Sequence, residues 1–351
     1  MERLIDPDLD LILAQTGEIW RDLRGARIFI TGGTGFYGAW LLETLIAANE
    51  KFSLGVRAEI LTRDENAFRL KCPHLAASSV FSFCKGDVRD FDFLKTGFTH
   101  IIHAATEASA KLNSENPALM REVIVKGTHR ALEFAKKCGA SRFLLTSSGA
   151  VYGRQRPEVT HISEDDEGLL YPVVPPSAYA EGKREAERLC REAQGRQFQV
   201  SITRGFAFVG PYLPLDIHFA IGNFIRDALE GNAIMIQGDG TPYRSYLYGL
   251  DLAIWLWTVL LRGQDGRAYN VGSENAISIL DLARAVAKTI NPQIAVHLAR
   301  NPEPGKIPER YVPMTRRARE ELGLKETVSL EEAIRRTAEW AQMVGILKRA
   351  V

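Results

Sequence analysis

Short apolar runs alternate with longer segments of helical periodicity through about the first two hundred residues of the chain. The apolar runs are five or six residues long, and they predict strands over 27–31, 58–62, 80–84, 100–104, 142–147 and 199–204. Between them, apolar positions recur at helical spacing over 36–49, 117–138 and 177–194. Alternation of this kind needs crossover connections, so the pattern predicts a doubly wound α/β fold with a parallel sheet.

The pattern changes after Arg204. Glycine, proline and aromatic residues dominate 205–250, which predicts loops with one helix near 220–230. Helical periodicity returns over 278–290 and 329–343, on either side of a proline-rich stretch at 301–313 that we expect to be an extended arm. These late segments predict a smaller lobe over the carboxyl ends of the strands, where open α/β sheets bind ligands.

Composition and charge narrow the class of protein. The chain has 44 basic and 43 acidic residues, a net charge of +1, which gives no sign of nucleic-acid binding. The histidines form no metal-binding motif and no cysteine pair has CxxC spacing, so we expect no metal site and buried thiols at Cys72, Cys84, Cys138 and Cys190. The N-terminus has no cleavage signature and the apolar stretch 252–261 is too short to span a bilayer, so we expect a soluble cytoplasmic protein.

A glycine-rich stretch, TGGTGFYG, follows the first predicted strand and precedes a helical pattern. Gly32, Gly35 and Gly38 are spaced GxxGxxG, which permits a sharp turn, a close backbone approach to a pyrophosphate and tight packing of helix on strand. The N–H groups at the helix start favour the bound anion. The stretch therefore predicts a dinucleotide site in a Rossmann-type sheet, with a purely structural turn as the alternative.

These patterns divide the chain into three parts. Residues 1–25 predict an N-terminal helical extension that docks through Leu, Ile and Trp20 side chains. Residues 26–204 predict the NAD(P)-binding domain, and 205–351 mainly the substrate-binding lobe. Within that lobe we expect about 247–273 to return to the sheet.

The second predicted strand ends in Thr62-Arg63-Asp64. An NAD-preferring site usually has Asp or Glu at this point to hold the ribose 2′-hydroxyl, whereas a guanidinium can hold a 2′-phosphate. Arg63 therefore favours NADP(H), and NAD(H) stays open because Asp64 follows directly.

Three residues further along carry candidate chemistry. Ser148 follows the fifth predicted strand, and Tyr179 and Lys183 are four residues apart, so they share one face of a helix. We expect the Lys183 ammonium to lower the pKa of the Tyr179 phenol, and Ser148 to donate a hydrogen bond to the same substrate oxygen. Such a trio suits proton transfer at an alcohol or carbonyl while a hydride passes to or from a nicotinamide.

Taken together, these motifs resemble the extended short-chain dehydrogenases/reductases, in particular the nucleotide-sugar epimerase/dehydratase family. The resemblance covers roughly 26–343 and rests on TGGTGFYG, GDVRD, HAA, SSGAVYG, YAEGK, GDGTPYRSYLY and AYNVGS. It implies a nucleotide-sugar substrate, a supply of precursors for polysaccharide biosynthesis, and a homodimer joined through the helices at 117–138 and 177–194.

The resemblance also implies roles for residues at matching positions. Ser148, Tyr179 and Lys183 are implied to be catalytic, and the last two also to contact the cofactor. Further cofactor contacts are implied for Gly32, Thr34, Gly35, Phe36, Tyr37, Gly38, Asp87, Val88, Ala104, Ala105 and Thr106. Besides Ser148 and Tyr179, substrate contacts are implied for Asn223, Arg244 and Arg310, with Arg244 on the diphosphate.

The sequence departs from the family pattern beside the serine. Gly149 and Ala150 stand where dehydratases and decarboxylases of the family carry acidic residues, and neither has a titratable group. Ala207 and Ile124 stand where many members have Asn, so we expect the substrate to be held differently.

Four hypotheses about function follow. The first is reduction at C4 of a nucleotide-linked keto-deoxysugar, supported by Arg63 and by the missing acidic pair. The alternative is an epimerase that keeps NAD tightly bound and uses the same three residues. The third hypothesis is a 4,6-dehydratase or decarboxylase, but the acidic residue that these enzymes usually carry is missing from this chain. The fourth is a non-catalytic protein that binds a dinucleotide or sugar nucleotide, and it leaves the presence of Ser148, Tyr179 and Lys183 unexplained.

Overall fold

The structure, a computed structural model, describes residues 5–93, 97–106, 110–166, 168, 172, 176–195, 197–217 and 219–345. The first four residues of the predicted N-terminal extension and the last six of the predicted lobe lie outside these ranges.

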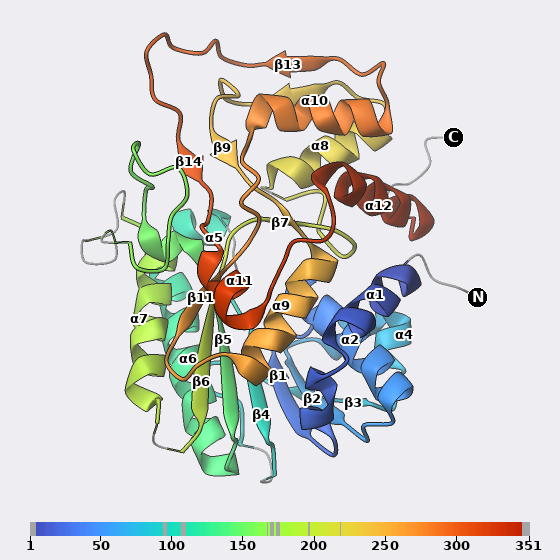
Figure 1. The fold of residues 1–351 in the computed structure, drawn as a ribbon, viewed down its shortest axis with the longest axis vertical. Coiled ribbons are helices and arrows are strands. Elements are labelled where there is room, and N and C mark those ends of the chain that lie inside the picture. Colours follow the sequence, from blue (N-terminus) through green and yellow to red (C-terminus); the bar gives the residue numbers. More distant parts are fainter. Residues whose placement is uncertain are drawn as a thin grey trace.

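A parallel sheet of seven strands forms the centre, in the order β11-β6-β5-β4-β1-β2-β3 (Figure 1). Its strands are β1 (Arg27–Thr31), β2 (Arg57–Thr62), β3 (Phe81–Lys85), β4 (His100–His103), β5 (Arg142–Ser148), β6 (Gln199–Gly205) and β11 (Ala268–Val271). The six predicted strands are confirmed with bounds that differ by at most one residue. The strand order reverses between β1 and β4, which is where ligands bind in sheets of this topology.

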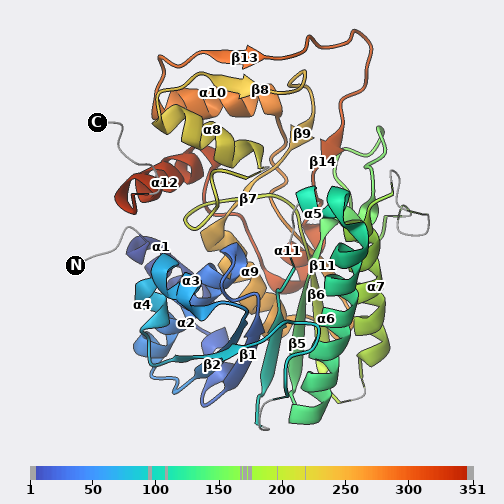
Figure 2. The ribbon, with the colours of Figure 1, turned by 180° about the vertical axis from the view of Figure 1, so that it is seen from behind.

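Helices cover both faces of the sheet, which confirms the doubly wound α/β fold (Figures 1 and 2). Ile28 and Ile30 of β1 belong to one apolar core and Phe29 to the other, because successive side chains of a strand point to opposite faces. The first core lies under α2 (Phe36–Phe52) and α9 (Gly249–Arg262), and the second under α6 (Pro117–Cys138) and α7 (Ala178–Ala193). Shorter helices of this half are α3 (Glu65–Lys71), α4 (Pro73–Ala76), α5 (Ala110–Glu115) and the 3₁₀ helix η2 (Gly149–Tyr152).

The late segments form a second layer beyond the sheet, at the top of Figure 1. Its helices are α8 (Ala220–Leu229), α10 (Ile279–Ile290) and α12 (Leu330–Met343), which confirms the three helices predicted there. Short strands pair as β10 (Leu247–Tyr248) with β7 (Phe208–Val209), β13 (Val296–Leu298) with β8 (Ile234–Ile236), and β12 (Ile277–Ser278), β9 (Tyr243–Arg244) and β14 (Arg310–Tyr311) as a sheet of three. The chain returns to the central sheet through α9 and β11, and α11 (Arg316–Leu322) packs against β11.

The N-terminal segment packs against α2 and α9 through α1 (Asp6–Thr16) and the 3₁₀ helix η1 (Ile19–Leu23). Trp20 is fully buried, its ring centroid lies 5.2 Å from that of Trp257, and its Nε1 donates to Thr16 Oγ1 at 2.8 Å. Tyr248 Oη donates to Asp8 Oδ2 at 2.7 Å, and Arg336 of α12 forms an ion pair with the same carboxylate. This segment therefore joins the sheet half to the last described helix.

The apolar stretch 252–261 lies inside α9, where all its residues are buried. None of the helices in the described part of the chain is long and apolar enough to cross a membrane. Of the four cysteines, which are all free, Cys84 is half-buried and the other three are buried, as predicted.

Candidate active site

The glycine-rich turn lies between β1 and α2. Gly32 has φ +74°, and a Cβ there would lie 2.4 Å from the backbone carbonyl of Ala104, so both its conformation and its space require glycine. A Cβ at Gly38 would lie 2.2 Å from the Gly33 carbonyl oxygen, because the first turn of α2 packs directly on this loop. Gly35 begins α2 without a side-chain cap, and the first turn holds no acidic residue, so its N–H groups can bind an anion.

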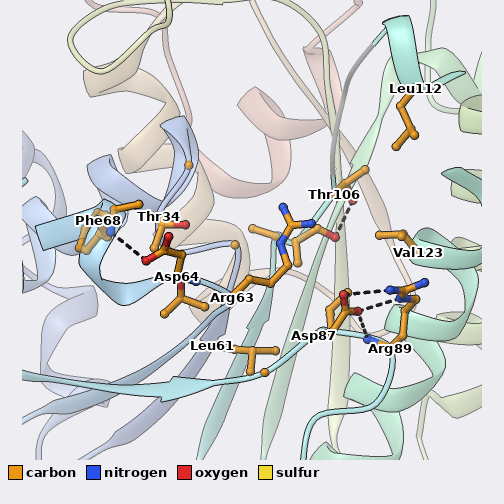
Figure 3. A pocket seen from close by; sticks show the side chains of 18 of the residues that line it. Thr34, Leu61, Arg63, Asp64, Phe68, Asp87, Arg89, Thr106, Leu112 and Val123 are labelled. Carbon is orange, nitrogen blue, oxygen red and sulfur yellow. Dashed lines mark hydrogen bonds and ion pairs between the residues drawn. The ribbon is translucent and has the colours of Figure 1, made fainter. Parts of the chain in front are cut away.

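A cleft of about 520 Å³ opens beside this turn (Figure 3). It lies at the carboxyl ends of β1, β2, β3 and β4, where the sheet order reverses. The predicted cofactor residues that line it are Gly32, Thr34, Gly35, Arg63, Asp87, Val88, Ala104, Ala105 and Thr106. Of the other predicted cofactor residues, Phe36, Tyr37 and Gly38 lie in the first turn of α2, and Tyr179 and Lys183 lie on α7.

Four of the charged side chains that line this cleft form what we call the charged rim: Arg63, Asp64, Asp87 and Arg89. Figure 3 shows the Arg63 side chain extending into the cleft between Asp64 and Asp87. Arg89 binds both carboxylate oxygens of Asp87, at 2.9 and 3.1 Å, and lowers the pKa of that carboxyl group. Asp64 Oδ1 accepts from the Ala67 N–H at 3.0 Å and so caps α3, a helix that the sequence analysis did not predict.

The three predicted catalytic residues lie together at the ends of β5 and α7. Ser148 is the last residue of β5, and the Ser177 side chain caps α7 just before Tyr179. Lys183 is buried, and its Nζ lies 5.9 Å from the centroid of the Tyr179 ring. Nζ donates at 2.7 Å both to Thr106 Oγ1 and to the Thr146 carbonyl oxygen, which connects the trio to the cleft.

The pKa of Tyr179 is shifted in the direction opposite to our prediction. Desolvation by burial raises the pKa of Tyr179, and a hydrogen bond with Ser148 lowers it by less. Lys183 is not among the groups that shift the pKa of Tyr179. Burial lowers the pKa of Lys183 itself to about 8.

Two further tyrosines reach this site, and together with Ser148 and Tyr179 we call them the hydroxyl cluster: Tyr37, Ser148, Tyr179 and Tyr311. Tyr311 comes from β14 of the lobe, its hydroxyl lies beside Gly149, where a Cβ would be 2.7 Å from it, and burial raises its pKa. Charge on Tyr179 or Tyr311 would raise the pKa of Tyr37, which burial already raises, so the three phenols are close neighbours. The sequence did not single out Tyr311, because a two-residue strand has no readable periodicity.

The remaining predicted substrate residues lie in the lobe. Arg244 of β9 pairs in register with Tyr311, and its charge lowers the pKa of that phenol, so it lies near the hydroxyl cluster. Arg310 stacks over the Tyr243 ring at 4.3 Å from its centroid. Asn223 of α8 accepts at 3.4 Å from Arg226 of the same helix. The structure therefore brings Arg244 beside the hydroxyl cluster and gives Arg310 and Asn223 partners within the lobe.

Comparison with known proteins agrees with this geometry. The model of the family described as "NAD dependent epimerase/dehydratase family" matches residues 28–272. The chain belongs to this family. The matched range includes the glycine turn, the cleft and the three residues Ser148, Tyr179 and Lys183. The resemblance noted in the sequence is therefore confirmed at the level of the family.

Among curated relatives of this epimerase/dehydratase family member are two proteins of Arabidopsis thaliana. UDP-glucuronic acid decarboxylase 2 is 32% identical over 314 residues, which cover 89% of this chain and 67% of the relative. UDP-glucuronic acid decarboxylase 5 is 32% identical over 309 residues, 88% of this chain and 87% of the relative.

Solved structures of the family show the same fold. A dTDP-glucose 4,6-dehydratase from Streptomyces venezuelae, determined with NAD bound, has a TM-score of 0.76 at 23% identity and covers 91% of this chain and 98% of its own. A UDP-glucose 4-epimerase from Thermotoga maritima, determined with UDP-glucose, has a TM-score of 0.75 at 21% identity and covers 91% and 99%. At such identities the likeness establishes the fold and does not establish the reaction.

Proposed function

We propose that this family member reduces a ketone at C4 of a nucleotide-linked deoxysugar. The observation that carries the proposal is the composition of the hydroxyl cluster. Among the described residues, three kinds of group affect the pKa values of its phenols: the other phenols of the cluster, the Ser148 hydroxyl and the Arg244 guanidinium. A ketone reduction needs a proton donor and a hydrogen-bond donor at one oxygen, and Tyr179 and Ser148 supply both.

A nicotinamide dinucleotide fits the cleft, because Gly32 leaves space that a Cβ would fill and the start of α2 presents N–H groups without a side-chain cap. Its chemistry when bound is hydride transfer to or from a carbon. Tyr179 then donates its phenolic proton to the carbonyl oxygen as the C4–H bond forms, and becomes a phenolate. Ser148 donates a hydrogen bond that polarises the carbonyl, and the buried Lys183 ammonium supplies positive charge beside the phenolate.

We also propose NADP(H) as the preferred cofactor, with Arg63 holding the 2′-phosphate. Arg63 lines the cleft, and its side chain extends into the cleft between Asp64 and Asp87 (Figure 3). Lys71 lines the same cleft and adds positive charge. Two such cations stabilise a doubly charged 2′-phosphate more than they stabilise a neutral 2′-hydroxyl.

A second candidate function is decarboxylation of a nucleotide-linked uronic acid, since the relatives at 32% identity carry that name. The hydroxyl cluster can also serve oxidation at C4 followed by its reversal. An acidic side chain in place of Gly149 would require the rings of Tyr311 and Phe206 to move, because a Cβ there would lie 2.7 Å from Tyr311 Oη and 2.8 Å from the Phe206 ring. Any extra acid step would therefore need a group from elsewhere.

One assay separates these functions. The purified protein is incubated with NADPH or NAD⁺ and with a nucleotide-linked 4-keto-6-deoxysugar, uronic acid or hexose, and the products are weighed by mass spectrometry. We expect NADPH to be consumed in proportion to the ketosugar. Loss of carbon dioxide without net change of cofactor would establish the decarboxylase instead. A product of unchanged mass that chromatography separates from the substrate would establish an epimerase with tightly bound NAD.

We further propose that two copies of the chain associate through α6 and α7, which pack side by side on one face of the sheet. Light scattering during gel filtration should give the mass of a dimer. A monomer at micromolar concentration would contradict this.

A further inference from the structure

A buried histidine joins two strands at the point where the order of the sheet reverses. His103 ends β4 and pairs in register with Thr31, which ends β1. Its Nδ1 lies 2.8 Å from Thr31 Oγ1, and its Nε2 lies 3.1 Å from Oγ1 of Thr128 on α6. All three side chains are buried. They therefore form a continuous chain of hydrogen bonds, which we call the histidine chain, from α6 to the end of β1.

Backbone groups at the two ends set the direction of the histidine chain. The Thr128 hydroxyl gives its one proton to the Ile124 carbonyl oxygen at 2.7 Å, so it accepts from His103. Burial lowers the pKa of His103 to about 3, so at neutral pH the ring has one proton, on Nε2, and accepts at Nδ1. The Thr31 hydroxyl therefore donates to Nδ1, and a lone pair of the same oxygen accepts from the Ala105 N–H at 3.1 Å.

The histidine chain ends at the wall of the cleft that faces the glycine-rich turn. Ala104 and Ala105 line the cleft, and the Ala104 carbonyl group occupies the space that a Cβ at Gly32 would need. We propose that His103 is a positioning residue, which through Thr31 holds the Ala104–Ala105 segment in the place that a bound dinucleotide requires. The inference rests on the proposed function only in assuming that a dinucleotide occupies the cleft.

The same segment is held from its other side by Lys183. Thr106 Oγ1 donates to the Ala105 carbonyl oxygen at 2.8 Å and accepts from Lys183 Nζ at 2.7 Å. Both polar groups of the Ala105 backbone are thus bound, the N–H by the histidine chain and the carbonyl oxygen by Thr106. A shift of Ala105 would therefore disturb cofactor binding and the position of the Lys183 ammonium together.

The decisive variant is Thr128→Val, because Thr128 is not among the residues that line the cleft and lies at the far end of the histidine chain. Without that acceptor, the His103 proton can move to Nδ1, and Thr31 Oγ1 then has to accept from both Nδ1 and the Ala105 N–H. We expect the dissociation constant for the preferred dinucleotide, NADP⁺ or NAD⁺, to rise about two- to tenfold, the effect of one hydrogen bond. Calorimetry on cofactor-free protein measures this constant.

The matched control is Thr337→Val on α12. Thr337 is as buried as Thr128 and likewise donates to a carbonyl oxygen of the preceding helical turn, that of Ala333 at 2.6 Å. Its substitution should lower thermal stability and leave the dissociation constant unchanged. A merely structural role of Thr128 would give the same result as this control.

Nuclear magnetic resonance tests the direction of the histidine chain. Long-range ¹H–¹⁵N spectra of protein labelled with ¹⁵N-histidine give the tautomer of His103, and His103→Gln assigns its signal among the seven histidines. We expect the Nε2–H form in the parent protein and a mixture of both tautomers in Thr128→Val. His103→Gln keeps one donor and one acceptor, so it should bind the dinucleotide more tightly than His103→Leu, which keeps neither.

Two results would each overturn the inference: a proton on Nδ1 of His103 in the parent protein at neutral pH, or equal effects of Thr128→Val and Thr337→Val on the dissociation constant. If the parent protein binds neither NADP⁺ nor NAD⁺, the proposed cofactor is wrong, and the amide signal of Ala105 decides the role of His103. That signal should shift in Thr128→Val and stay in place in Thr337→Val. An Ala105 signal unchanged in both variants would overturn the inference as well.

Discussion

The charged rim carries ionised side chains that are exposed or half-buried, whereas the hydroxyl cluster carries neutral groups that are buried or half-buried. Both lie at the carboxyl ends of strands in one sheet, yet they use different physics. Charges near water bind anions and tolerate small displacements. Hydroxyls in a low-dielectric site act through directional hydrogen bonds, so their positions have to be fixed by the packing around them. Substitutions in the charged rim should therefore mainly weaken cofactor binding, and substitutions in the hydroxyl cluster should mainly lower kcat.

The largest expected effect is at the hydroxyl cluster. Tyr179→Phe should reduce kcat by about 10²–10⁴-fold, the usual effect of removing a positioned proton donor, and leave cofactor binding within about twofold. Steady-state kinetics with the ketosugar and calorimetric titration with the cofactor measure the two quantities. Unchanged turnover would show that Tyr179 is not the proton donor. The proposed difference in role between the charged rim and the hydroxyl cluster would then be lost as well.

The next effect is at the charged rim. Arg63→Ala should weaken NADP⁺ binding about 10- to 100-fold and leave NAD⁺ binding nearly unchanged, because only NADP⁺ carries the 2′-phosphate. Calorimetry on cofactor-free protein tests this, with Arg69→Ala on the same stretch as control, since Arg69 pairs with Glu65 and does not line the cleft. Tight NAD⁺ binding that is indifferent to Arg63 would favour the epimerase.

A pH profile sharpens the comparison. The pKa of Lys183 is lowered by burial to about 8, so its ammonium is present below that pH and lost above it. We expect kcat to fall up to about tenfold per pH unit above pH 8, because the charge beside the Tyr179 phenolate disappears. Cofactor affinity at the charged rim should vary less over the same range. A flat kcat profile up to pH 10 would contradict this role of Lys183.

Salt should give the smallest effect, and only in one region. Raising ionic strength from about 0.05 to 0.5 M screens charges near water, so NADP⁺ binding should weaken a few-fold. The kcat of the saturated enzyme should stay constant, because the hydroxyl cluster has low solvent access. An equal response of both quantities would show that the two regions are not electrostatically distinct.

The predictions from sequence succeeded where local pattern determines structure. Strands and helices of the sheet follow from periodicity, and the left-handed Gly32 follows from the need for a tight turn beside Ala104. Asp64 was readable as well, since an aspartate before a helical segment is a typical N-cap, although we had considered it only as a ribose ligand.

Tertiary packing determined the rest. Tyr311 lies beside Gly149 although it comes from a two-residue strand of the lobe, and no local pattern connects it with YAEGK. The direction of the Tyr179 pKa shift could not be derived from the spacing of Tyr179 and Lys183, because burial of the phenol is the largest cause and depends on the whole fold. Which roles these residues play in turnover stays a prediction until the variants are made.

The ion pair between Asp8 and Arg336 joins residues that are 328 positions apart. A ribosome adds about 5–20 residues per second, so α1 emerges roughly 15–65 s before its partner helix α12. During this interval the nascent chain has a helix whose carboxylate and apolar face lack part of their final surroundings. This contact can therefore be completed only after Arg336 has been translated, although Asp8 is translated well before it.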